Sequence, residues 1–216
     1  MSRLWLRRSL AKWHRKLAHR QRRLKVSVRH HRPNSAKKWR KLVDEAHQKI
    51  ARREKQLRAR TPMRLRALDQ MLAWARGHVV EEGGNNIGPV VSKIIREAGG
   101  TPGEPWCGDT VAASYLRAGS KMVSRAWAYV PTLAKLLMRV RNPAGGHVVT
   151  YDFQGDGTED HTGVFVRWID RALGDFEAVE GNTGTDGARS DGQGDGVHVR
   201  RRNVHTHGAR FYRVLR

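Results

Sequence analysis

Positive charge is concentrated in the first third of the chain, and this asymmetry most restricts how the chain can fold. Residues 1–66 contain 24 Lys and Arg against 3 Asp and Glu, a formal charge of +21, whereas residues 67–216 contain 18 and 17. The 216 residues therefore form a strongly cationic front segment joined to a nearly neutral body, either as one full domain with an appendage or as two small domains. Such a charge attracts nucleic acid, anionic lipid and wall polymers without selecting among them.

The cationic segment has the apolar spacing of two helices. Residues 3–31 place their apolar side chains on one helical face, and the other faces are almost wholly Arg, Lys and His. Pro33 and Asn34 interrupt the pattern, and Ser35 is a candidate cap for the second helix. The stripes are Leu6, Leu10, Trp13, Leu17 and Leu24, then Trp39, Leu42, Val43, Ala46, Ile50 and Leu57. We expect residues 1–62 to form a basic helical hairpin or short coiled coil, whose charge is either simply solvated or also binds a polymer.

Thr61-Pro62 marks the junction with a body of residues 63–216. The body begins with helical spacing and changes, from Gly145, to short strands rich in Val, Phe, Tyr and Trp. The expected helices cover residues 63–80, 90–98, 107–119 and 131–140, and the expected strands cover residues 147–153, 162–169, 176–180, 196–201 and 210–215. Residues 181–196, dominated by Gly, Asp, Ser and Thr, are expected to form a mobile loop. Helices followed by strands predict an α+β domain with an antiparallel sheet.

The single cysteine, Cys107, excludes an internal disulfide framework and suits a chain made in a reducing compartment. The basic N-terminus lacks the uninterrupted apolar stretch of a secretory signal. No run approaches the roughly 18–20 apolar residues of a membrane span. We therefore expect the protein to be made in the cytoplasm without a signal peptide, so that any later export depends on another component.

Cys107 follows a loop containing Pro105 and begins a predicted helix. Unpaired amides and the positive end of the helix dipole stabilise a thiolate, which is the reactive form of cysteine, although the adjacent Asp109 opposes this slightly. The alternative is a buried structural cysteine, because a free thiol packs well as a small apolar group.

Three polar residues in the predicted strands could complete a site around this thiol. His161 opens one strand, and Glu180 and Asn182 lie at the end of the next. Residues two apart on an extended chain share a face, so one imidazole could meet both side chains. A thiol, an imidazole and a polar group that orients the imidazole form a nucleophilic triad. Each residue also has an ordinary explanation when taken alone: His161 as a histidine at the end of a strand, Glu180 as a solvated charge, and Asn182 as a turn-forming residue.

The chain resembles the CHAP family, the cysteine, histidine-dependent amidohydrolases/peptidases found in phage endolysins and bacterial wall hydrolases. The similarity covers roughly residues 65–216 and follows the family's order of Cys, His, then Glu and Asn. The matching motifs are Pro105-Trp106-Cys107-Gly108, Asp160-His161-Thr162-Gly163 and Glu180-Gly181-Asn182. The resemblance implies a papain-like α+β fold, with N-terminal helices and a C-terminal antiparallel sheet.

By this resemblance, Cys107 attacks an amide carbonyl of the peptidoglycan stem peptide, and its backbone amide helps to stabilise the oxyanion. His161 is the general base, and either Glu180 or Asn182 is the residue that orients it. Relatives often carry Gly-Asp before the first strand, where this chain has Gly-His, and this leaves His147 as a second candidate base.

Neither a metal nor a cofactor is expected. The acidic segment of residues 152–160 alternates oxygen ligands as calcium loops do, but it lacks the full loop and its terminal glutamate, so a plain turn between strands is favoured. His198, His205 and His207 have no accompanying cysteine or carboxylate spacing for zinc.

The sequence thus predicts a cysteine amidase or endopeptidase that acts on the bacterial cell wall as phage endolysins do. Peptidoglycan is the expected substrate, and residues 1–62 could anchor the enzyme to anionic wall polymers or a membrane surface. The alternative is a nucleic-acid-binding or virion-associated protein that works through its basic helices. A papain-type protease acting on proteins is a third possibility. The scissile bond, N-acetylmuramoyl-L-alanine or a peptide bond of the stem or cross-bridge, stays open.

Overall fold

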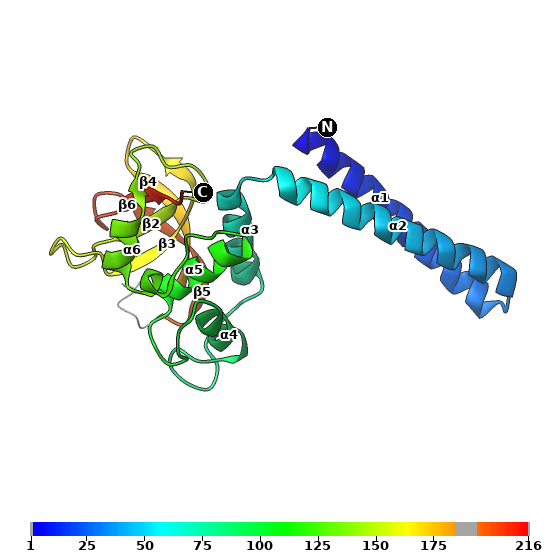
Figure 1. Cartoon of the computed structure of the whole chain (residues 1–216), viewed down its shortest axis with the longest axis horizontal. Coiled ribbons are helices and arrows are strands. Elements are labelled where there is room, and N and C mark those ends of the chain that lie inside the picture. Colours follow the sequence, from blue (N-terminus) through cyan, green and yellow to red (C-terminus); the bar gives the residue numbers. More distant parts are fainter. Residues whose placement is uncertain (1, 185–193, 216) are drawn as a thin grey trace. The chain divides into compact units, whose positions relative to one another are not determined.

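The chain divides after Pro62 into two units, residues 1–62 and 63–216 (Figure 1). The structure is a computed structural model that describes residues 2–184 and 194–215. None of the helices in these ranges is both long enough and apolar enough to cross a membrane.

The first unit is a helical hairpin of α1 (Arg3–Arg29) and α2 (Pro33–Arg60). Every residue of the predicted stripes is buried or half-buried, and Ser27 and Ala36, outside the stripes, are buried as well. The buried stripe residues are Leu6, Val43, Ala46 and Ile50. The predicted cap at Ser35 is wrong, because α2 begins at Pro33, and the Ser35 hydroxyl instead lies 2.8 Å from that of Ser27 across the hairpin.

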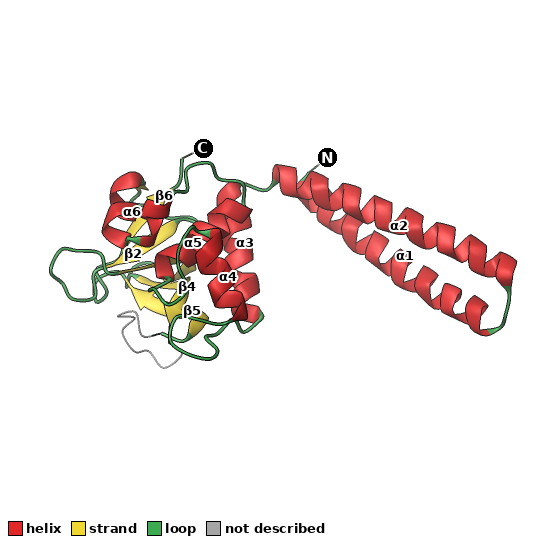
Figure 2. Ribbon diagram, turned by 60° about the horizontal axis from the view of Figure 1, so that its bottom comes forward, coloured by secondary structure: helices red, strands yellow, loops and turns green. Residues whose placement is uncertain are grey.

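The second unit combines helices with an antiparallel sheet, which confirms the α+β prediction (Figure 2). In the part of the chain that the structure describes, the sheet has six strands in the order β1-β6-β2-β3-β4-β5. The helices are α3 (Met63–Arg76), α4 (Pro89–Glu97), α5 (Cys107–Arg117), the short 3-10 helix η1 (Arg125–Ala128) and α6 (Val130–Leu136). The strands are β1 (Met138–Arg139), β2 (Val148–Tyr151), β3 (His161–Asp170), β4 (Asp175–Thr183), β5 (Gly196–Asn203) and β6 (Arg210–Arg213).

Several predicted boundaries change: the helix expected over residues 63–80 ends at Arg76, and two further changes come from strand pairing. The helix expected over residues 131–140 ends at Leu136, because Met138 and Arg139 pair with β6 as an edge strand. Residues 181–183, expected in a loop, continue β4. The rest of that expected loop falls largely on residues 185–193, which lie outside the described residues.

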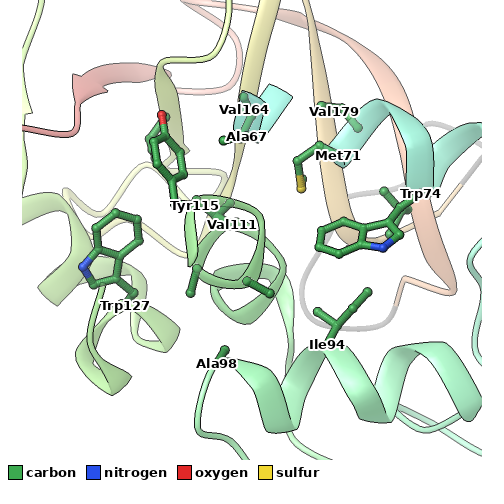
Figure 3. Packing of buried hydrophobic residues seen from close by; sticks show 14 of the residues in the cluster. Ala67, Met71, Trp74, Ile94, Ala98, Val111, Tyr115, Trp127, Val164 and Val179 are labelled. Carbon is green, nitrogen blue, oxygen red and sulfur yellow. The ribbon is translucent and has the colours of Figure 1, made fainter. Parts of the chain in front are cut away.

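Alternation along the strands separates two clusters of buried side chains. Val148, Val164 and Val179 join a core that includes Met71, Trp74, Ile94, Val111, Tyr115 and Trp127. Figure 3 shows Val164 and Val179 in this core together with side chains of α3, α4 and α5. Tyr151, Phe165 and Phe176 belong to a second cluster on the opposite face. The residues of the candidate site alternate in phase with this aromatic cluster.

Candidate active site

Cys107 is the first residue of α5 and is 7 % exposed. Two close contacts hold this first helical turn in place. A Cβ on Gly108 would lie 2.4 Å from the Trp127 carbonyl oxygen, and a Cβ on Gly181 of β4 would lie 2.1 Å from Oγ1 of Thr110. Only glycine allows these approaches, so the helix start is wedged between η1 and β4. The first-turn amides have no carbonyl four residues earlier within the helix, and they make this end electropositive.

His161 opens β3 and is 1 % exposed. Its ring stacks on Tyr151, at 5.8 Å between centroids, and on Phe153, also at 5.8 Å. The side chain of His161 hydrogen-bonds Cys107 and Glu180. Burial alone would lower the pKa of His161, but these two bonds outweigh burial and raise it from 6.5 to about 9. The imidazole therefore lies between a thiol and a carboxylate.

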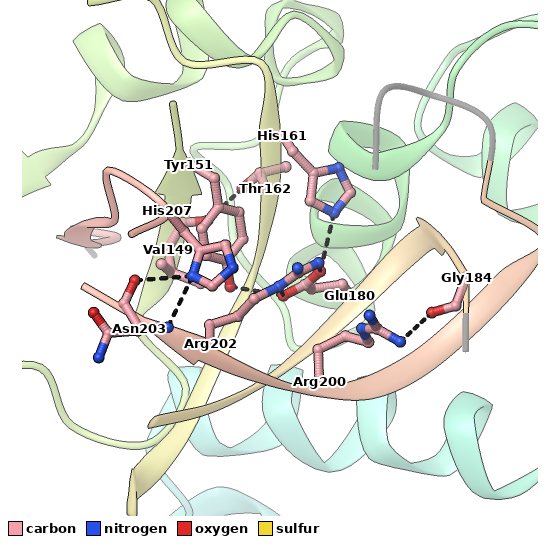
Figure 4. Close-up of polar contacts among 10 residues, drawn as sticks. All are labelled: Val149, Tyr151, His161, Thr162, Glu180, Gly184, Arg200, Arg202, Asn203 and His207. Carbon is pink, nitrogen blue, oxygen red and sulfur yellow. Dashed lines mark hydrogen bonds and ion pairs between the residues drawn. The ribbon is translucent and has the colours of Figure 1, made fainter. Parts of the chain in front are cut away.

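Glu180 lies on β4 with its side chain fully buried, and its Oε2 is 3.2 Å from Nε2 of His161 (Figure 4). Burial would raise the pKa of this carboxyl, but hydrogen bonds from Arg202 and His161 hold it well below its usual range. Glu180 is thus ionised. Since Nε2 is occupied by Glu180, the ring nitrogen left to face the thiol is Nδ1.

Two residues that the sequence does not single out, Arg202 and Tyr151, complete this cluster. Arg202 of β5 donates from Nε to Oε1 of Glu180 at 2.9 Å and from Nη2 to Oε2 at 2.6 Å. The hydroxyl of Tyr151 on β2 donates to Oε1 at 2.7 Å. The sequence carried no signal for Arg202: the apolar residues of its strand, Val197 and Val199, are out of phase with it, and no sequence pattern links it to Glu180.

Asn182 is also buried on β4, but the alternation that would give it the same face as Glu180 is interrupted there. Its φ is +54°, and the pairing of β4 with β5 shifts register between Glu180 and Thr183. The residue seen hydrogen-bonded to Nε2 of His161 is Glu180.

Asp109, which opposes a thiolate at the helix start, is paired with Arg125. The Arg125 guanidinium contacts Oδ1 of Asp109 at 2.7 Å and Oε2 of Glu104 at 2.6 Å. Burial raises the pKa of Asp109 to about 6, against the lowering effect of Arg125. Arg125 therefore offsets part of the negative charge that Asp109 places beside Cys107.

Cys107 lines a groove of about 480 Å³. Two segments form its walls, residues 104–131 and residues 154–160 of the β2–β3 connection. The acidic and basic side chains among its described lining residues are the carboxylates of Glu104, Asp156, Glu159 and Asp160 and the guanidinium of Arg125. The thiol therefore opens onto a groove with an excess of carboxylates.

The second candidate base lies elsewhere. Nδ1 of His147 accepts a hydrogen bond from the amide of Ala144 at 3.2 Å. Burial, with the nearby charges of Arg64 and Arg213, lowers the pKa of His147. The structure thus brings His161 against Cys107 and places His147 beside two arginines.

The acidic β2–β3 connection uses its carboxylates to hold its own backbone. The two carboxylate oxygens of Asp152 accept from the amides of Gly155, at 2.7 Å, and Gly157, at 3.0 Å. Across residues 2–184 and 194–215, no group of three or more His, Cys, Asp or Glu side chains could hold a metal ion.

Comparisons of the chain with protein-family models, with curated proteins and with solved structures find no match. The chemistry of the site is therefore inferred from its own side chains. A thiol at a helix N-terminus, hydrogen-bonded to a buried imidazole that a buried carboxylate orients, is an arrangement suited to nucleophilic attack on a carbonyl.

Proposed function

We propose that the chain is a cysteine peptidoglycan hydrolase with a papain-like, CHAP-type catalytic domain, similar in action to phage endolysins. The observation that carries the proposal is the hydrogen-bonded row of Cys107, His161 and Glu180 beside the groove. A thiol, an imidazole and a carboxylate in this order supply the nucleophile, the base and the orienting group of acyl transfer, whereas a binding module requires no such arrangement.

In the proposed reaction, Nδ1 of His161 takes the thiol proton and Sγ of Cys107 bonds to the carbonyl carbon of an amide. The amide of Cys107 at the start of α5 donates to the oxyanion. Collapse breaks the carbon–nitrogen bond, and His161 gives its proton to the leaving amine. Water then attacks the thioester, His161 takes a proton from the water, and the carboxylic acid product leaves as the thiol is restored.

The groove favours a peptide over a polyanion as the group beside the thiol. Its carboxylates, Glu104, Asp156, Glu159 and Asp160, exceed its single guanidinium, Arg125, among the described lining residues. Such a surface repels a phosphate backbone and tolerates the free amino groups of stem peptides. This observation favours an amide substrate over nucleic acid at the groove.

We further propose that residues 1–62 bind an anionic wall polymer by charge. A bilayer would be entered by the apolar stripes of α1 and α2, but these are buried or half-buried between the two helices. Cations lie over the rings of Trp5 and Trp39, with Arg53 4.7 Å from the Trp5 ring centroid and Arg23 5.5 Å from that of Trp39, although Trp5 itself is 43 % exposed. Binding should weaken steeply with salt. Nucleic acid binding by the same helices is the second candidate, and tighter binding to duplex DNA than to purified walls would favour it.

Product analysis tests the substrate and the bond together. Purified walls treated with the protein should release soluble fragments carrying new free amines. N-terminal analysis of those fragments separates cleavage after N-acetylmuramic acid, which exposes the amine of L-alanine, from cleavage within the stem or cross-bridge. Release of peptides from denatured casein, with no new amines from walls, would instead support a protease acting on proteins.

A further inference from the structure

Arg202 has an unusual environment for a guanidinium. Its side chain is 2 % exposed and contacts both carboxylate oxygens of Glu180. The guanidinium carbon lies 5.3 Å from the ring centroid of Tyr151 and 5.0 Å from that of Phe153. Two parallel N–H donors fix the plane of the carboxylate (Figure 4), and the two aromatic rings fix the guanidinium.

The charges of the site alternate when the thiol is ionised. A Cys107 thiolate, a His161 imidazolium, a Glu180 carboxylate and an Arg202 guanidinium sum to zero. Without Arg202, the three remaining charges would leave a net negative charge in a buried place, which is costly. The cheapest relief is to protonate the thiolate or the carboxylate, and either change weakens the nucleophile.

We propose that Arg202 is a positioning residue that acts through Glu180: its two-point contact keeps the carboxylate aimed at Nε2 of His161, and thereby keeps the imidazole in place to activate the thiol of Cys107. The proposal rests on the proposed function for the role of Cys107 as nucleophile, but it does not depend on which substrate is cleaved. Glu180 and His161 lie between Arg202 and the thiol, so we assign Arg202 no contact with the reacting atoms.

Other titratable groups face this cluster from the neighbouring elements. On β2, the pKa of Tyr151 is raised well above 10.0 by burial and by Glu180, so its phenol stays a neutral donor. Asp160 precedes His161, and burial raises its pKa. His207, after β5, has its pKa lowered by burial and by Arg202, although Asn203 opposes this. These groups are present in every variant below, but Arg202→Met removes the effect of Arg202 on the pKa of His207 and of Tyr151. Arg202→Lys keeps the charge and so disturbs these two groups less.

A purely stabilising ion pair is the alternative role. Buried pairs often contribute little net stability, and replacing both partners by neutral groups is frequently tolerated. The two roles therefore separate in a double-mutant cycle that measures thiol reactivity rather than stability.

The experiment measures the alkylation rate of Cys107 by iodoacetamide from pH 5 to 10 in the full chain. This reaction forms a sulfur–carbon bond, releases iodide and needs no wall substrate. Arg202→Met should slow alkylation at pH 7 by about tenfold or more and move the acid limb of the profile up by about one pH unit or more, the change expected from loss of one nearby charge. Arg202→Lys should shift the limb in the same direction by less, because it keeps the charge and loses the two-point contact.

Two controls fix the interpretation. Arg201→Met removes the neighbouring arginine, which is 67 % exposed and pairs with Asp175 at the surface, and should leave the profile unchanged. In a Glu180→Gln background, Arg202→Met should add no further shift of the alkylation profile. The double variant leaves neither Glu180 nor Arg202 as an unpaired buried charge, so it can be measured even if Arg202→Met alone fails to fold. A wild-type profile in folded Arg202→Met or Arg202→Lys, or an additive shift in the double variant, would overturn the proposal.

The same measurements separate this proposal from the proposed function. If wild-type protein fails to hydrolyse walls while the alkylation profiles shift as expected, the substrate is wrong and the role of Arg202 stands. If wild type hydrolyses walls and Arg202→Met alkylates as wild type does, the role of Arg202 is wrong and the enzyme stands.

Discussion

Nε2 of His161 lies 3.2 Å from Oε2 of Glu180, and the exposed fractions of the two side chains are 1 % and 0 %. This contact fixes one ring nitrogen of the imidazole and directs the other toward Cys107 at the start of α5. It joins two adjacent strands to a helix, so the site depends on the register of the sheet as well as on the three residues themselves.

Replacing Glu180 by Gln should lower wall hydrolysis mainly through His161. The amide keeps the size of the side chain but removes a charge that raises the pKa of His161. Each unit by which this pKa falls makes protonation of the imidazole about tenfold less favourable. Initial rates across pH 5 to 9 measure the effect, with Glu177→Gln as the matched control. Glu177 lies on the same strand but pairs with Arg167 at the surface. Equal losses in the two variants would contradict the assigned role.

The charged His161 should make stability depend on pH at alkaline values. Its pKa is about 9 in the folded chain against 6.5 ordinarily, so the folded state binds more protons between these values. Taken alone, this shift gives a stabilisation that is complete below pH 6.5 and is lost as the pH rises through about 9. A proton that passes from Cys107 to His161 is no net gain for the folded chain until the unfolded thiol ionises, near pH 8.5. The free energy of unfolding should therefore fall with pH more steeply in wild type than in His161→Asn only above about pH 8, by up to about 1.4 kcal/mol per pH unit. Urea unfolding under reducing conditions gives both slopes, and equal slopes above about pH 8 would contradict the raised pKa.

Gly181→Ala should push the first turn of α5 away from β4. The added Cβ would lie 2.1 Å from Oγ1 of Thr110, and such overpacking costs about 1–3 kcal/mol. We expect a lower free energy of unfolding together with a lower alkylation rate of Cys107. Thr110→Ala should restore part of both. Gly77→Ala, whose Cβ would meet only the Ala73 and Trp74 carbonyl oxygens, at 3.2 and 3.6 Å, is the mild control. If Gly181→Ala and Gly77→Ala have the same free energy of unfolding and the same alkylation rate, the close approach of Gly181 to Thr110 does not hold the helix start in place.

Ala46→Glu should disrupt the helical hairpin. Ala46 is 0 % exposed in the contact between α1 and α2, which we call the seam, and burying an uncompensated polar group there costs about 2 kcal/mol or more. Ala51→Glu adds the same favourable charge to the exposed side of the same helix, so it isolates the effect of burial. The expected result is a smaller helical circular-dichroism signal at 222 nm in Ala46→Glu only. Equal signals in the two variants would mean that the seam does not hold the helices together.

Local patterns were sufficient to predict the helical stripes, the change from helices to strands, and the position of Cys107 at a helix start. They failed where a distant partner decides the structure. Leu136 ends its helix because the following residues pair with β6, and Ser35 contacts Ser27 instead of capping α2. Neither partner is visible in a local window.

Arg202 illustrates the same limit within the site. Its contact with Glu180 depends on β5 lying beside β4, and on a diagonal reach along the sheet that strand periodicity cannot specify. Tyr151 was a strand residue without a chemical reason for selection until its pairing with His161 brought its ring and hydroxyl to the site. By contrast, His161 and Glu180 could be selected because their residue types and order suggested chemistry directly.

The most direct test of the central claim is the loss of turbidity of purified bacterial cell walls, comparing wild type with a Cys107→Ala variant shown to be folded. The proposed mechanism predicts that wild type clears the walls and that Cys107→Ala does not, because no other group can form the thioester. Clearing by Cys107→Ala at the wild-type rate would contradict the assignment of Cys107 as nucleophile.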